Sequence, residues 1–305
     1  MKELDLSIDI AGISLKNPVM TASGTFGYGD EYADLVDLSR LGAIIPKGIS
    51  LRPIEGNPPP RIVETPAGML NSIGLQNVGV DVFVHEKLPF LKKYKTPIIV
   101  NIFGHTVEEY SQLAKRFDGL DIAGLEVNIS CPNVKRGGLV FGCDPGMAFE
   151  VIRAVRRETS LPIIAKLSPN VTDIAVLVRS VQDGGADAIS LINTLLGMAV
   201  DVGSRRPKLA NVVGGLSGPA IKPVALRMVW QAASVTQLPV IGIGGIMRAS
   251  DALEFMIAGA SAVEIGTAHF VRPTAALDIV AGMREYLTDH GIERIAQIVG
   301  SLRNE

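Results

Sequence analysis

The sequence predicts a closed (β/α)8 barrel, or TIM barrel, because short buried strands alternate with helices about eight times. The apolar, β-branched runs lie at residues 18–23, 43–48, 97–103, 124–130, 162–168, 188–194, 239–245 and 262–267. Helical periodicity fills most of the intervals between them, at 107–116, 148–158, 172–183, 220–234 and 249–258. Strands that are apolar on both faces and alternate with helices form parallel sheets. Eight such units favour closure over an open, doubly wound sheet.

Three further stretches complete the predicted architecture. Residues 4–15 alternate like a hairpin that turns at Ala11 and Gly12, and this hairpin would plug the N-terminal end of the barrel. Two long irregular insertions, 49–76 and 133–145, are active-site loop candidates, because long loops in compact domains are usually functional or disordered. No linker interrupts the chain, so we predict a single domain over residues 1–305.

Composition excludes several classes of protein. The chain has 305 residues, of which 47% are hydrophobic and 20% are charged, with a net charge of −2, so neither nucleic acid nor an acidic membrane is an expected partner. No apolar run reaches the roughly 18 residues of a membrane span. The N-terminus is too acidic and too broken for a signal peptide. Cys131, Cys143 and four scattered histidines lack metal-ligand spacing, so we expect a cytoplasmic protein without a metal site.

Active sites of such barrels lie at the carboxyl ends of the strands. The residues at those ends are mostly polar or glycine: Ser23, Lys47, Asn101, Asn128, Cys131, Lys166, Asn193, Thr194, Gly244, Gly245, Gly266 and Thr267. Each one alone could be a solvated strand end. Together, two lysines and several carboxamides without an obvious carboxylate partner indicate a pocket for an anionic or electron-rich planar ligand.

Residues 128–133, Asn-Ile-Ser-Cys-Pro-Asn, place a thiol between two carboxamides where a strand ends at Pro132. Such a thiol can act as a nucleophile or a proton acceptor, and the carboxamides can bind the amides of a planar ligand. The segment alone is equally compatible with a buried structural cysteine. The other strand ends favour function for Cys131, whereas Cys143 is assigned no catalytic role.

Glycines after the seventh and eighth strands predict a phosphate site, because bare backbone N–H groups bind anions there. Residues 214–219 form a third, flexible loop that could add amides. No G-x-G-x-x-G opens a helix after a strand, so NAD binding by this chain is not supported. A phosphate at these loops and a lysine on the fifth strand suit FMN, with Lys166 at the N1/O2 edge of its ring.

The motifs as a set resemble those of class 1 dihydroorotate dehydrogenases, most closely the catalytic subunit of the NAD-linked class 1B enzymes. The matching motifs are Ala22-Ser23-Gly24, Lys47-Gly48, Asn71-Ser72-Ile73-Gly74-Leu75, residues 128–133, Lys166-Leu167-Ser168, Ile192-Asn193-Thr194, Gly244-Gly245 and Gly266-Thr267. Cys131, and no sign of the extra N-terminal segment of class 2 enzymes, are typical of class 1. Lys135-Arg136-Gly137-Gly138 resembles class 1B rather than the fumarate-using class 1A.

The resemblance implies oxidation of dihydroorotate to orotate on one FMN per chain, in pyrimidine (UMP) biosynthesis. Cys131 would remove the C5 proton while hydride leaves C6 for flavin N5. The implied substrate-binding residues are Lys47, Asn71, Ser72, Ile73, Gly74, Leu75, Asn128, Asn133, Asn193 and Thr194. The implied FMN-binding residues are Ser23, Lys47, Gly48, Asn101, Asn128, Lys166, Ile192, Gly218, Gly244, Gly245, Gly266 and Thr267.

The electron acceptor has to come from elsewhere, since the chain shows no NAD fold and no cysteine cluster for an iron–sulfur centre. The resemblance implies a partner subunit with FAD and a [2Fe–2S] cluster, which passes electrons to NAD⁺ in a heterotetramer of two catalytic and two electron-transfer chains. Two alternatives stay open: a class 1A homodimer that reduces fumarate, and a non-redox barrel that binds or isomerises a sugar phosphate.

Overall fold

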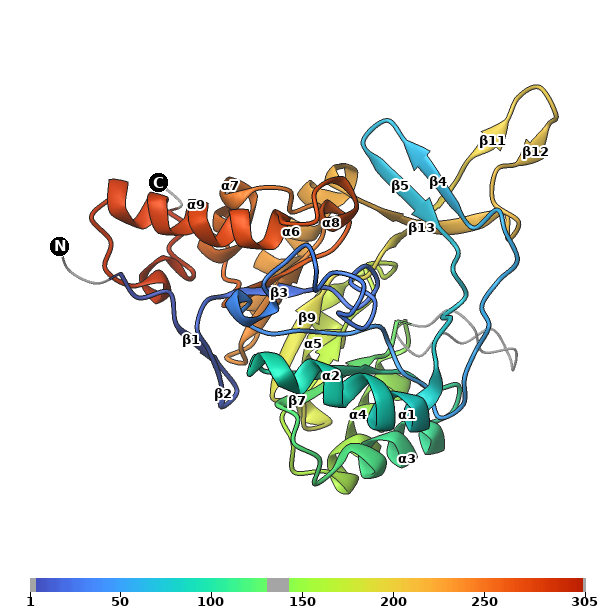
Figure 1. The fold of residues 1–305 in the computed structure, drawn as a ribbon, viewed down its shortest axis with the longest axis horizontal. Helices are drawn as coiled ribbons and strands as arrows, with labels where there is room; N and C mark the ends of the chain where they lie inside the picture. The colour runs from blue at the N-terminus through green and yellow to red at the C-terminus, as the bar shows by residue number, and fades with distance from the viewer. Residues whose placement is uncertain (1–3, 131–142, 304–305) are drawn as a thin grey trace.

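The computed structural model describes residues 4–130 and 143–303, and these form the predicted barrel (Figure 1). Within these ranges one sheet contains seven parallel strands, in the order β3-β15-β14-β9-β8-β7-β6. Their bounds are β3 (Val19–Thr21), β6 (Ile99–Ile102), β7 (Gly124–Asn128), β8 (Ile163–Lys166), β9 (Ala188–Leu191), β14 (Val240–Ile243) and β15 (Ala262–Ile265).

Residues 43–49 take the place of the eighth strand and lie between the two edge strands of this sheet, β3 and β6. The backbone N–H of Thr21 on β3 donates to Ala43, while Ile44 donates to Pro97 at 2.9 Å and accepts from Ile99 of β6 at 3.0 Å. The segment makes single bridges rather than a regular ladder, but it is bonded to both edges. The predicted (β/α)8 barrel is therefore confirmed.

The helices on the outside agree with the predicted ones to within a few residues at each end. Side-chain caps explain where several begin: Thr106 accepts from the N–H of Glu109, Asp144 from Met147 and Asp173 from Ala175. The main helices are α3 (Val107–Phe117), α4 (Pro145–Glu158), α5 (Ile174–Asp183), α6 (Lys222–Ala233), α7 (Ala249–Ile257) and α9 (Ala275–Asp289). Shorter ones are α1 (Gly79–Val82), α2 (Leu88–Leu91) and α8 (Ala268–Val271), with single turns at Leu38–Arg40, Phe83–Lys87, Lys92–Tyr94, Pro219–Ile221 and Ile295–Ile298.

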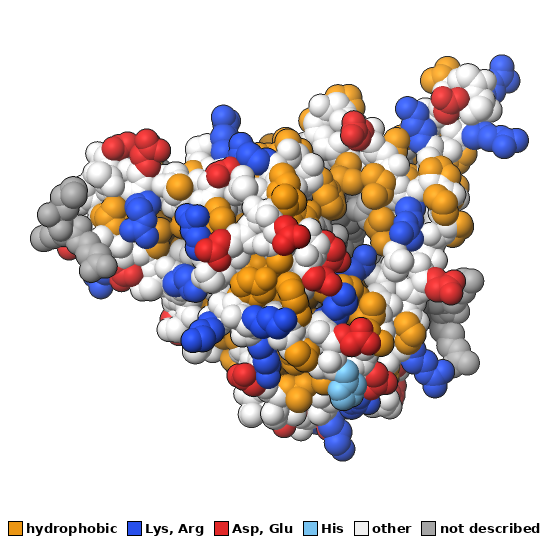
Figure 2. Space-filling model, viewed as in Figure 1, with side chains coloured by type: hydrophobic (Ala, Val, Ile, Leu, Met, Phe, Trp, Pro, Cys, Tyr) orange, Lys and Arg blue, Asp and Glu red, His pale blue; other side chains and the backbone are white. Residues whose placement is uncertain are grey.

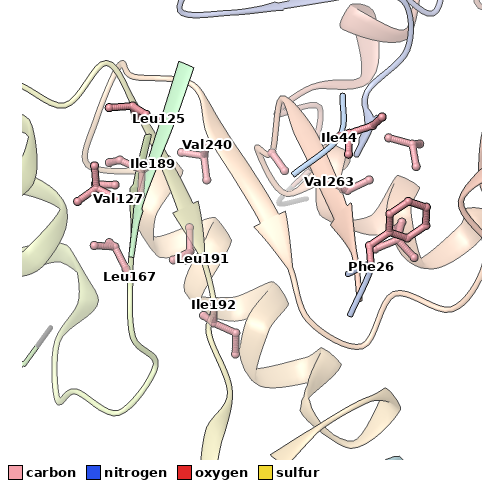
Figure 3. Close-up of a cluster of buried hydrophobic side chains, with 14 of the residues drawn as sticks. Phe26, Ile44, Leu125, Val127, Leu167, Ile189, Leu191, Ile192, Val240 and Val263 are labelled. Carbon is pink, nitrogen blue, oxygen red and sulfur yellow. The ribbon is translucent and has the colours of Figure 1, made fainter. Parts of the chain in front are cut away.

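Alternate strand residues face the helices and form the larger core. Leu125 and Val127 on β7 and Ile189 and Leu191 on β9 are fully buried on this outer face (Figure 3). The residues between them face the barrel interior, as the twofold period of a strand requires.

The N-terminal end of the interior is apolar and closed by a hairpin, as predicted. The strands β1 (Ile8–Ile10) and β2 (Ile13–Leu15) bring Ile10, Ile13 and Leu15 into one buried cluster with barrel residues such as Ile99 and Ile164. This cluster is separate from the outer core.

A small antiparallel sheet stands on the barrel and corrects two predictions. Its order is β10 (Leu195–Met198), β13 (Val213–Ser217), β5 (Gly68–Asn71) and β4 (Ile62–Thr65), so the insertion 49–76 contains a hairpin. Residues 213–217 form a strand rather than the expected flexible loop, because a backbone without side chains at Gly214 and Gly215 packs closely on its neighbours. The hairpin of β11 (Val200–Asp201) and β12 (Arg206–Pro207) projects beyond this sheet (Figure 1), and its tip carries charged side chains (Figure 2).

Candidate functional site

The carboxyl half of the barrel interior is polar and charged. Four strands each place an apolar residue and, two positions later, a polar residue on the interior face of the barrel. These pairs are Ile99 and Asn101, Ile164 and Lys166, Ala188 and Ser190, and Ala262 and Glu264. Glu126 on β7 faces the same space, since it bonds to Asn101, Lys166 and Ser190. All five polar side chains are buried.

Lys166 lies between two buried carboxylates at the centre of this layer. Its Nζ is 3.1 Å from both carboxylate oxygens of Glu126 and 2.8 Å from Oε2 of Glu264. Glu126 also accepts from Asn101 Nδ2 at 2.5 Å and from Ser190 Oγ at 2.7 Å. The other oxygen of Glu264, Oε1, has no hydrogen-bond partner among the described residues.

The two carboxyl groups differ in protonation because of these partners. Burial alone would raise the pKa of Glu126, but Lys166 and the hydrogen bonds hold the pKa below its usual range. Burial, and then the negative charge of Glu126, raise the pKa of Glu264 well above its usual range. Burial would lower the pKa of Lys166, yet the two carboxyl groups raise it, so the ammonium stays charged.

This arrangement corrects the expectation that the lysines lack a carboxylate partner. Lys166 has two such partners, and both stand in the middle of strands that the sequence analysis treated as uniformly apolar. The sequence does contain a signal for these partners, because β7 and β15 each carry a single glutamate within an otherwise apolar run.

A pair of carboxamides lies at the ends of β7 and β9. Asn193 Nδ2 is 3.4 Å from Asn128 Oδ1, which also accepts from the N–H of Ser130 at 3.1 Å. The buried hydroxyl of Tyr110 on α3 donates to the backbone oxygen of Asn128 at 2.8 Å and so fixes the start of the segment that leads to Cys131. Asn128 is the register partner of Lys166, so the amide pair and the charged layer adjoin. Cys131 and Asn133 themselves lie outside the described residues.

The predicted substrate loop 71–75 adjoins the same end of the barrel. Asn57 holds it by donating its N–H to the oxygen of Ile73 and its side-chain amide to Ser72, both at 2.9 Å. Asn71 Nδ2 donates to the backbone oxygen of Gly215 on β13. Gly215 packs closely on Thr194, since a Cβ atom added to this glycine would lie 2.1 Å from Thr194 Oγ1. The small sheet therefore connects the loop to Thr194.

Lys47 lies within the segment 43–49 that completes the barrel, and it is half-buried. Burial, and then the nearby guanidinium of Arg61, lower the pKa of Lys47. Arg61 is anchored by Asn57 and by Gln76 Oε1 at 2.7 Å. Arg61 was not among the predicted site residues, because its position in a proline-rich insertion gave no sign that the chain folds back towards Lys47.

The glycine loops that were predicted to bind phosphate come together. A Cβ on Gly245 would lie 2.9 Å from the oxygen of Gly218, and Gly244 and Gly245 have φ angles of 127° and 72°, which only glycine adopts readily. Thr267 Oγ1 is 2.8 Å from Ser217 Oγ, directly before Gly218. Ile192 lies beside Gly244, and Gly266 beside Ala22, the neighbour of Ser23. Gly48 faces Asn101, since its Cβ would lie 2.6 Å from Asn101 Oδ1.

The donors and acceptors of these residues fit a polar planar cofactor. Ser72 Oγ, Asn101 Oδ1 and Glu264 Oε1 are buried side-chain atoms without a hydrogen-bond partner among the described residues, and all three belong to this end of the barrel. Buried polar atoms are normally paired, so Ser72 Oγ and Asn101 Oδ1 are candidate ligand-binding atoms.

Two other features lie beside the site. A cavity of about 460 Å³ touches it only at Gly245. Among its charged lining residues, Asp251 pairs with Lys222 and Arg248, and Arg272 pairs with Asp278, so we assign the cavity no role. Cys143 is exposed, and its Sγ is 3.3 Å from the oxygen of Asn170.

Over the described ranges, no group of three or more His, Cys, Asp or Glu residues could hold a metal ion, and no helix is long and apolar enough to cross a membrane.

Comparison with known proteins decides the family. The family model "Dihydroorotate dehydrogenase" matches residues 5–287. The chain belongs to the dihydroorotate dehydrogenase family. It is 63% identical over 303 residues to a protein of Geobacter sp. strain M21 and to one of Geotalea uraniireducens, covering 99% of each chain. A third relative, from Geobacter sulfurreducens, is 61% identical over 303 residues, again with 99% of both chains covered. All three are named dihydroorotate dehydrogenase B (NAD⁺), catalytic subunit.

For this dihydroorotate dehydrogenase family member, the resemblance found in the motifs is confirmed. The structure brings Lys166 and Asn101 together on Glu126, and it pairs Asn128 with Asn193 and Gly218 with Gly245.

Proposed function

We propose that this chain is the catalytic subunit of an NAD-linked, class 1B dihydroorotate dehydrogenase, which oxidises dihydroorotate to orotate in pyrimidine biosynthesis in the cytoplasm. The observation that carries the proposal is the paired carboxamides Asn128 and Asn193 next to the buried, charged Lys166. Relatives of 61–63% identity that bear this name over 99% of their length support it.

The substrate would be held by its ring amides and its carboxylate. Each carboxamide offers an acceptor and two donors, so Asn71, Asn128, Asn133 and Asn193 can bind a ring that alternates N–H and C=O groups. Lys47 and Arg61 repel each other, and a carboxylate bound by Lys47 would relieve that repulsion. The loop from Ser72 to Leu75 and Thr194 would complete the pocket.

One FMN per chain would supply the hydride acceptor for C6 of the substrate. Gly218, Gly244, Gly245, Gly266 and Thr267 would bind its phosphate through backbone and hydroxyl donors. The flavin ring would be surrounded by Ser23, Lys47, Gly48, Asn101, Asn128 and Ile192, with Lys166 where negative charge develops on reduction.

Cys131 would take the proton from C5 as the hydride leaves C6, so that the C5–C6 bond becomes double. A correctly positioned base contributes roughly 10²–10⁴-fold to rate. The hydrogen bonds that Asn128 accepts from Tyr110, Ser130 and Asn193 would fix the position of the backbone that leads to Cys131.

The electrons would leave through a second subunit. The relatives' name "catalytic subunit" implies such a partner, and we propose that it carries FAD and a [2Fe–2S] cluster and reduces NAD⁺ in a complex of two catalytic and two electron-transfer chains.

Anaerobic mixing of the purified chain with dihydroorotate, followed by flavin absorbance, tests the proposal. We expect bleaching that fumarate does not reverse and that NAD⁺ reverses only with the partner subunit. Recovery with fumarate would indicate a class 1A enzyme instead. A colourless protein, even after FMN is added, would point to the non-redox barrel.

Replacement of the proposed base gives a sharper test. We expect Cys131→Ala to bind FMN and to unfold like the wild type, but to bleach at least about 100-fold more slowly with dihydroorotate. Cys143→Ala is the matched control and should bleach at the normal rate. A Cys131→Ala protein with near-normal bleaching would exclude this residue as the base.

A further inference from the structure

The charged layer contains one carboxyl group more than its single cation can balance. Lys166 contacts both Glu126 and Glu264, and the two carboxyl groups also interact directly with each other. The side chains of Lys166, Glu126 and Glu264 are 6%, 0% and 0% exposed. A buried charge without a counter-ion costs several kcal/mol even after relaxation. Two ionised carboxylates on one ammonium would leave such a charge in the barrel.

The contacts show which carboxyl group is neutral. Glu126 accepts from Lys166, Asn101 and Ser190, which together stabilise a negative charge on both of its oxygens. Glu264 accepts only from Lys166, through Oε2, and its Oε1 has no partner among the described residues. The ion pair is therefore Glu126 with Lys166, and the second carboxyl group is the one that binds a proton.

No other described group can balance Glu264. On the neighbouring strands, β3 and β14, the described residues are apolar, glycine or Thr21, whose hydroxyl bonds to Ile45. The charged groups that face Glu264 are Glu126 from β7 and Lys166 from β8, while Ser190 of β9 and Asn101 of β6 are neutral.

We propose that Glu264 holds a proton inside the barrel and is a positioning residue for Lys166, so that the cluster of Glu126, Lys166 and Glu264 is electrically neutral. This inference rests on the proposed function, in which Lys166 faces the flavin. The neutral acid orients the ammonium with a hydrogen bond but does not add a second negative charge. Reduction of the flavin, which places negative charge near Lys166, is then not opposed by an excess anion.

Glutamine variants of the reconstituted holoenzyme test the charge count through the midpoint potential of the bound flavin. With one proton in the cluster, Glu264→Gln and Glu126→Gln each leave a net charge of zero, because the remaining carboxyl group ionises against Lys166. We expect both single variants to keep a potential close to that of the wild type, and the double variant, with a net charge of +1, to shift it upwards. If both carboxyl groups were ionised, each single variant would already raise the potential by a similar step, and the proposal would be wrong.

Infrared spectroscopy of the chain without flavin tests the proton itself. We expect the wild type at neutral pH to show the C=O stretch of a buried carboxylic acid, and both single glutamine variants to lack it. Glu108→Gln, which changes an exposed glutamate of α3, should retain the band. Absence of the band from the wild type, or its persistence in Glu264→Gln, would overturn the proposal. If Glu264→Gln does not fold, Glu126→Gln decides, because persistence of the band in that variant would also overturn the proposal.

The two measurements separate the two proposals. A chain that binds no flavin would refute the proposed function, while the infrared band would still decide whether the cluster of Glu126, Lys166 and Glu264 holds a proton.

Discussion

The two ends of the barrel interior are built from the same strands but have opposite chemistry. At the N-terminal end, Ile99, Ile164, Ala188 and Ala262 pack against the hairpin in one apolar cluster. Two residues further along each strand, the same interior face carries Asn101, Lys166, Ser190 and Glu264. The two layers are separated by about 6–7 Å, the rise of two strand residues.

The difference shows how one barrel divides stability from chemistry. The apolar end is closed by Ile10, Ile13 and Leu15, which are buried, so it contributes hydrophobic free energy and no polar group that needs a partner. At the polar end, Asn101 Oδ1 has no hydrogen-bond partner among the described residues, an arrangement that costs stability unless a ligand supplies the partner. Changes at the two ends should therefore have separable effects.

Loss of the central cation should have the largest effect. Lys166→Met leaves Glu126 buried without its counter-ion, and breaking a buried pair in this way costs about 3–5 kcal/mol. We expect both a lower urea midpoint and weak FMN binding. Lys87→Met, which removes the partly exposed pair with Asp30, should cost no more than about 1 kcal/mol and leave FMN bound. Equal losses in the two variants would contradict the assigned role of the cluster.

Truncation at the apolar end should lower stability without changing the chemistry. Ile10→Ala removes a fully buried side chain from the hairpin, which costs about 2–5 kcal/mol in a packed core. Urea unfolding should show this loss, whereas FMN affinity and the bleaching rate should be those of the wild type. Ile62→Ala, at a half-exposed position on β4, is the control and should change stability by less than about 0.5 kcal/mol. A loss of FMN binding in Ile10→Ala would show that the two ends are coupled.

The same contrast explains what could be predicted from the sequence. Apolar runs predict which segments become strands, and glycines and amides follow several of them. The meeting of Asn128 with Asn193 at one end of the barrel could therefore be predicted from their positions alone. Glu126 and Glu264 were missed because each is a single charge within an apolar run, and only the closed barrel shows that this position faces Lys166. The strand 213–217 depends on pairing with β5, about 145 residues away, and Arg61 depends on the fold-back of the proline-rich insertion towards Lys47; no local pattern encodes either.

The smallest expected effect concerns a second buried titratable group at the polar end. His269 of α8 is 1% exposed and packs edge-on against Phe26 and Tyr32, with ring centroids 4.9 and 5.7 Å away. Burial lowers the pKa of His269 to about 4. Because the folded protein disfavours the protonated ring, its stabilising contribution is complete above the unfolded pKa of about 6.5 and declines as the pH falls towards 4.

His269→Leu should remove this acid sensitivity. Between pH 7 and pH 4 the wild type should lose up to about 3 kcal/mol more stability than the variant, since the pKa difference spans that window. Urea unfolding of both proteins across this range measures the difference directly, and a constant cost of altered packing in the variant cancels from it. Parallel pH profiles would mean that the ring becomes protonated in the folded protein as readily as in the unfolded one. A steeper loss in the wild type would instead confirm that His269 is held neutral by burial next to the predicted phosphate loop, in contrast to Glu264, where the same burial retains a proton.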